Sequence, residues 1–81
     1  MGADMFPAES LIAFVCTQKC PSSHDGDHAL IRKTYRKAVE VGVKAPSVYL
    51  DTWGGRTELV VDHDGGQIKF KQSRTNWRLK E

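Results

Sequence analysis

Side chains able to bind metal or act as nucleophiles recur at a regular spacing in the first third of the sequence. They are Cys16, Cys20, His24 and His28. Thiolates and imidazoles are the ligands that zinc prefers, and four of them could complete a tetrahedron. The spacing is not that of a zinc finger, because it has neither a C-x2-C pair nor a long insert before the histidines. We therefore expect no cofactor and keep zinc at these residues as the alternative.

The same segment also offers groups for redox or acid–base chemistry. A reactive thiol needs a helix N-terminus or a cation beside its sulfur, and the predicted helix begins some way after Cys20. The histidines alternate with Asp25 and Asp27, but a general acid or base needs a pocket that a loop does not supply. Both aspartates are explained as caps of the following helix. We therefore predict that the protein is not an enzyme.

Cations gather in the middle and near the end of the chain. Clustered cations release counterions from phosphates, which is the basis of nucleic-acid binding. The formal net charge is only +2, whereas nucleic-acid-binding domains are usually strongly basic. Nucleic-acid binding is therefore our alternative function, and its contact residues would be Arg32, Lys33, Arg36, Lys37, Arg74 and Arg78.

Aromatic residues next to arginines have the composition of protein-interface hot spots. The alternation of a strand puts Tyr49 and Trp53 on the face opposite Val48 and Leu50. The predicted contact residues are Tyr49, Trp53, Arg56 and Trp77. We therefore predict a small non-catalytic regulator or inhibitor that binds another protein. Such a role would suit, for instance, a phage-encoded protein.

One amphipathic helix, predicted over residues 28–43, must position these groups. Its apolar stripe comprises Leu30, Ile31, Tyr35, Ala38, Val39 and Gly42. Its other side carries four basic residues, which are Arg32, Lys33, Arg36 and Lys37. Asp25 or Asp27 can cap its start, and Gly42 can end it in a left-handed turn.

Alternating residues predict strands over 47–53, 57–63 and 67–72. Their inward side chains would be Val48, Leu50, Leu59, Val61, Ile68 and Phe70. The pair Asp64-Gly65 suits a type I′ turn, which would place Val61 opposite Ile68. A turn at Gly65-Gly66 would change the register but keep the same side chains inward. The sequence therefore predicts an antiparallel meander with one apolar face.

The two ends of the chain are harder to interpret. The apolar run 11–16 fits either a strand or a helix, and we favour a strand because Phe14 and Val15 prefer extended backbone. Residues 1–6 are predicted as a loose arm, and 73–81 as a tail or short helix anchored by Trp77. The fold class is then α+β in a single domain over 1–81. One main helix would pack on three or four mainly antiparallel strands, ordered β-α-β-β-β, or α-α-β-β-β if the run is helical.

Composition limits the remaining classes. The chain has 81 residues, of which 40% are hydrophobic, and this argues against disorder. Two cysteines are too few for a disulfide scaffold. No apolar run reaches the length of about 18 residues that suggests a membrane span. The run 11–16 is also too short for a secretory signal, so we expect a cytoplasmic protein with no membrane partner.

Overall fold

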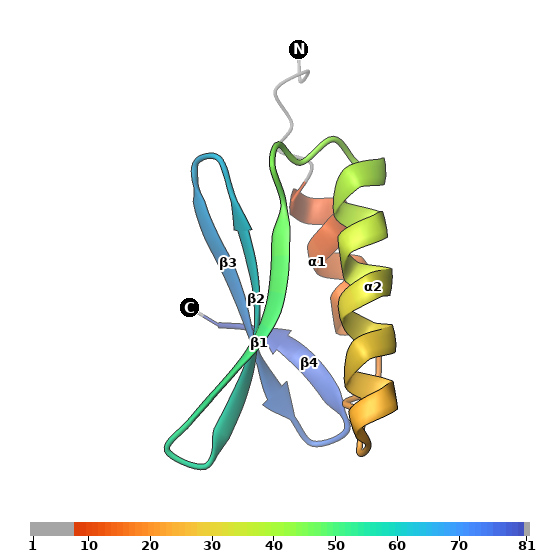
Figure 1. Ribbon diagram of the computed structural model, residues 1–81, viewed down its shortest axis with the longest axis vertical. Helices are drawn as coiled ribbons and strands as arrows, with labels where there is room; N and C mark the ends of the chain where they lie inside the picture. Colours follow the sequence, from red (N-terminus) through yellow and green to blue (C-terminus); the bar gives the residue numbers. More distant parts are fainter. Residues whose placement is uncertain (1–7, 81) are drawn as a thin grey trace.

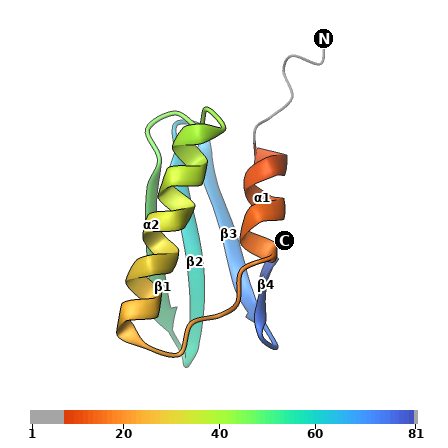
Figure 2. The same ribbon diagram turned by 90° about the vertical axis from the view of Figure 1, so that its right-hand side faces the viewer.

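The computed structural model describes residues 8–80, which form two helices and four strands. The elements are α1 (Ala8–Cys16), α2 (His24–Glu40), β1 (Ser47–Trp53), β2 (Arg56–His63), β3 (Gly66–Ser73) and β4 (Asn76–Leu79). The strands form one antiparallel sheet in the order β1-β2-β3-β4. Both helices lie on one face of this sheet, with α2 packed against β1 and α1 against β4 (Figures 1 and 2). The α+β prediction is confirmed in its helix-first order, whereas the predicted arm over 1–6 lies outside the described residues.

The first element is a helix, so the strand favoured from the sequence is wrong. Leu11 and Val15 are one turn apart, and both are fully buried in the core. Phe14 packs against the same core at its edge, beneath the ammonium group of Lys37. Packing of Leu11 and Val15 against α2 and β4 therefore outweighs the preference of Phe14 and Val15 for an extended backbone.

Helix α2 begins earlier than predicted, and a different residue caps it. The Ser23 hydroxyl accepts a hydrogen bond from the Gly26 amide at 3.0 Å, while Asp25 and Asp27 lie in the first turn. There their charges favour the helix dipole, but they are not the cap. At the other end Gly42 has a φ of +91°, and the Val43 amide donates to Ala38 at 2.9 Å. This is the left-handed termination that was predicted for Gly42.

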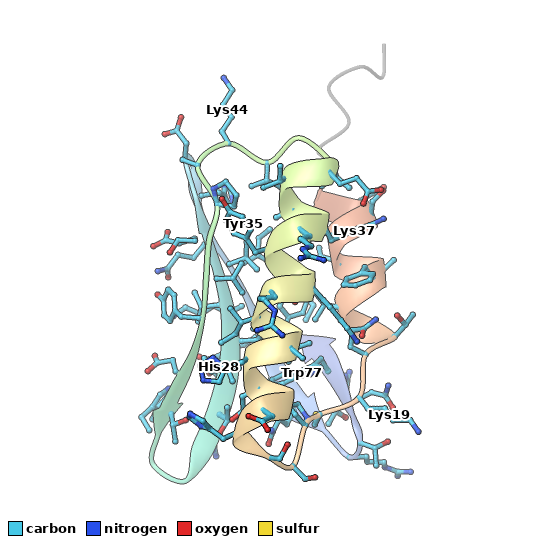
Figure 3. All side chains as sticks on the ribbon, turned by 45° about the vertical axis from the view of Figure 1, so that its right-hand side comes forward. Lys19, His28, Tyr35, Lys37, Lys44 and Trp77 are labelled. Carbon is cyan, nitrogen blue, oxygen red and sulfur yellow. The ribbon has the colours of Figure 1, made fainter. Side chains whose placement is uncertain are left out.

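The buried stripe of α2 is narrower than the predicted one. Leu30, Thr34 and Ala38 are its buried residues. Tyr35 and Val39 were expected in the core but are 45% and 51% exposed. Tyr35 lies on the flank of α2 beside β1, whereas Lys37 lies toward α1 (Figure 3). Helix α2 contacts the sheet through one face only, and no other described element covers the flank that carries Tyr35.

The predicted strand register is confirmed. Val61 lies opposite Ile68 and Leu59 opposite Phe70, and these four side chains are buried. Val48 and Leu50 pack against the same core. The predicted turn type at Asp64-Gly65 is wrong, since a type I′ turn needs a positive φ at both residues and only Gly65 has one. Gly54 and Gly55, with φ of +55° and +75°, meet that requirement instead.

Asn76–Leu79, within the segment predicted as a tail or short helix, form the fourth strand, and residue 81 lies outside the described range. Arg74 adopts a φ of +59° in the turn before this strand. Trp77 is 2% exposed and anchors the segment in the core, between the helices and the sheet (Figure 3). The Cys20 amide donates to the Thr75 carbonyl at 2.7 Å. The α1–α2 connection therefore protects the start of this edge strand.

Candidate functional site

The face of the sheet turned away from the helices is covered by no other described element (Figure 1). We call it the open face. Because neighbouring residues of a strand point to opposite faces, the register assigns its side chains directly. They include Tyr49, Asp51, Trp53, Arg56, Glu58, Val60, Asp62, Gln67, Lys69, Lys71, Arg78 and Lys80.

A buried carboxylate lies at the centre of the open face. The Glu58 side chain is only 5% exposed, and the Lys80 ammonium donates a hydrogen bond to it. That hydrogen bond is the main reason why the pKa of Glu58 is lowered, although burial opposes it. The charges of Lys80 and Lys69 and a hydrogen bond from Trp53 lower the pKa further. Lys80 also lies over the Trp53 ring, 5.6 Å from its centroid, so the indole is in contact with this charged cluster.

Three of the four predicted protein-binding residues gather here. Trp53 is 50% exposed, Tyr49 is 38% exposed, and Arg56 lies opposite Trp53 in the register. Val60 lies between Tyr49 and Lys69 and is buried, so it gives the face an apolar floor. Trp77 points to the other face and lies in the core, so its indole is not available at this surface.

The β3–β4 half of the open face is basic. Lys71 lies opposite Arg78, and the Lys80 amide donates to the Lys69 carbonyl at 2.9 Å, which aligns those two lysines as well. Among residues 8–80, Lys80 is the only cation of this face within ion-pair distance of a carboxylate. Arg56, Lys71, Arg78 and Lys80 line a hollow of about 710 Å³, in which Glu58 is the only acidic side chain among residues 8–80.

The residues predicted for nucleic-acid binding do not form one surface. Arg32, Lys33 and Arg36 are exposed on α2, on the helix side of the sheet. Lys37 is partly covered, since it lies near Glu40 at 3.6 Å and over Phe14. Arg74 lies in the β3–β4 turn and Arg78 on the open face. The α2 set and Arg78 are therefore separated by the thickness of the molecule.

The four residues of the zinc alternative are also divided. Cys16 ends α1, and the Cys20 thiol donates to the Asn76 carbonyl at 3.3 Å. Burial raises the pKa of Cys20, against the effect of a backbone hydrogen bond from Ser73. His24 and His28 pair with each other on α2, with 3.1 Å between their Nε2 atoms. Over the described range 8–80, no three histidine, cysteine or acidic side chains form a group that could hold a metal ion.

Sequence reasoning missed Glu58, Lys71 and Lys80 as parts of this surface. The predicted register, with Val61 opposite Ile68, also implies that Glu58 lies opposite Lys71, so the sequence did contain one signal. Because the predicted fold lacked β4, it did not place Lys80 on this face.

Comparisons with known proteins assign no relative. No protein family, curated protein or solved structure matches the chain. Neither helix of the described part is long and apolar enough to cross a membrane. The function must therefore be argued from the open face itself.

Proposed function

We propose that the protein is a small non-catalytic regulator or inhibitor that binds another protein through the open face. The observation that carries this proposal is the half-exposed Trp53, whose ring lies under the Lys80 ammonium group at 5.6 Å. Tryptophan, tyrosine and arginine are the residues that contribute most to protein interfaces.

The acidic residues of the open face favour a protein over a nucleic acid. Asp51 and Asp62 lie on it, so a phosphate chain crossing the face would meet two carboxylates. A protein can place cations against these groups and carboxylates against the lysines and arginines. Nucleic-acid binding by the basic side of α2, with Arg74 and Arg78, is the alternative outcome of the test below.

The test is affinity capture from a nuclease-treated lysate, followed by purification of the captured protein and measurement of its Kd by calorimetry. Trp53→Ala should weaken binding by about 30-fold or more, which corresponds to the roughly 2 kcal/mol of a hot-spot residue. Tyr35→Ala is the matched control, because Tyr35 is similarly exposed but lies on α2. It should leave the Kd unchanged, and urea unfolding should show that both variants are folded.

Two results would overturn the proposal. Binding that survives Trp53→Ala but is lost in an Arg32→Gln, Lys33→Gln variant would place the interface on α2. Capture that disappears after nuclease treatment, together with a gel shift that falls steeply with salt, would establish the nucleic-acid alternative.

A further inference from the structure

Three of the four cations that line the hollow of the open face have no internal ion-pair partner among the described residues. In the described chain, Arg56, Lys71 and Arg78 have no carboxylate within ion-pair distance. All three line the 710 Å³ hollow. The one acidic side chain there, Glu58, is already engaged by Lys80. The hollow therefore presents three cations to whatever enters it.

The arrangement of these cations opposes the stability of the sheet. Lys71 and Arg78 are direct cross-strand neighbours, and like charges in such a pair are destabilising. Lys69 and Lys80 are aligned in the same way, but Glu58 compensates that row, because it accepts the Lys80 hydrogen bond and also feels the charge of Lys69. Local rules of folding are most often broken at functional sites, where a ligand supplies what the fold lacks. A carboxylate placed between Lys71 and Arg78 would remove the repulsion.

From this charge complementarity we propose that the hollow binds a short acidic segment of the protein partner, a proposal that rests on the proposed function. The guanidinium groups of Arg56 and Arg78 can each hold a carboxylate through two parallel hydrogen bonds. The volume of the hollow is that of a pocket for a small ligand, so it fits a few side chains of an extended peptide. Trp53, beside the hollow, then contacts the residues that flank the acidic ones.

The probe is a capped hexaglutamate peptide, titrated into the isotopically labelled full chain and followed by amide chemical shifts. The largest shifts should fall on Arg56, Lys71 and Arg78, and they should vanish at high salt. Lys71→Gln, Arg78→Gln should weaken peptide binding by about tenfold or more, since each removes a charge-assisted hydrogen bond. Arg32→Gln, Lys33→Gln removes the same charge from α2 and should leave binding within about twofold, because α2 lies outside the hollow.

Three results would overturn the acidic-segment proposal. One is peptide binding that weakens equally in both double variants, since this would show a general attraction of charges. Another is tighter binding of an oligothymidylate of the same length at Lys71 and Arg78, since phosphate would then be the ligand. The third is a purified partner that loses affinity for Trp53→Ala but not for Lys71→Gln, Arg78→Gln. That last result would contradict only the acidic-segment proposal and would agree with the proposed function. A partner whose affinity is unchanged by Trp53→Ala would contradict the proposed function itself.

Discussion

Replacing Arg78 by glutamate should stabilise the fold, although Arg78 lies in the proposed site. Arg78→Glu turns the repulsive pair with Lys71 into an attractive one. A cross-strand charge pair contributes about 0.2–1 kcal/mol in either direction, so reversing its sign gives about 0.4–2 kcal/mol. Arg78 and Lys71 are both exposed, and solvent screening reduces this to about 0.4–1 kcal/mol. For a domain of this size the melting temperature should rise by about 2–8 °C.

Urea unfolding followed by circular dichroism measures this effect. The measurement is made at about 0.01 M and about 1 M salt, where the Debye length falls from about 30 Å to about 3 Å. The gain should be largest at low salt and nearly absent at high salt. Arg74→Glu is the control, because it changes the charge equally but lies in the β3–β4 turn outside the paired strands.

The reasoning fails if Arg78→Glu is no more stable than Arg74→Glu, or if its gain survives at high salt. Either result would mean that Lys71 and Arg78 do not repel one another in the folded protein. The energetic argument for an acidic ligand between them would then be lost. If the gain is observed, the same substitution should weaken hexaglutamate binding, which would show that stability has been given up for a ligand site.

Three further predictions concern the core, the central carboxylate and the buried thiol. Phe70→Ala empties a fully buried position and should lower the free energy of unfolding in urea by about 3–5 kcal/mol. This is a large share of a total stability of about 0.05–0.15 kcal/mol per residue. A loss below about 1 kcal/mol would contradict the assigned core. The pKa of Glu58 is lowered chiefly by the Lys80 hydrogen bond, so its stabilisation is complete above the unfolded pKa of about 4.3 and lost as pH falls through the folded value. The melting temperature should therefore fall less steeply in acid for Glu58→Gln than for the wild type, and parallel curves would refute this. Burial raises the pKa of Cys20, so in a Cys16→Ser background a thiol reagent should react more slowly with folded than with urea-unfolded protein; equal rates would count against it.

The meander could be predicted because its signals are local and agree with each other. Alternation along 57–63 and 67–72 fixes which side chains face inward, and a turn at Asp64-Gly65 aligns Leu59 with Phe70. The run 11–16 could not be assigned in this way, since a short apolar run fits both a strand and a helical stripe. Contacts of Leu11 and Val15 with residues distant in sequence decide it, and a single sequence does not display them.

Strand β4 was missed because its turn lacks the usual signals. Arg74 takes a positive φ where glycine or asparagine would be expected, and only four residues follow in the strand. This omission explains the misinterpretation of Trp77, since an aromatic residue in an unstructured tail would be exposed. In a strand beneath α1, the same residue is part of the core.

The burial of Trp77 and the basic charge of the open face have one cause. Because a strand alternates, placing Trp77 against the helices turns Arg78 to the opposite face, and Lys80 follows it there. Lys80 then reaches Glu58 and the Trp53 ring on the far strands of the sheet. The core contact of β4 therefore orients the aromatic side chain on which the proposed interface depends.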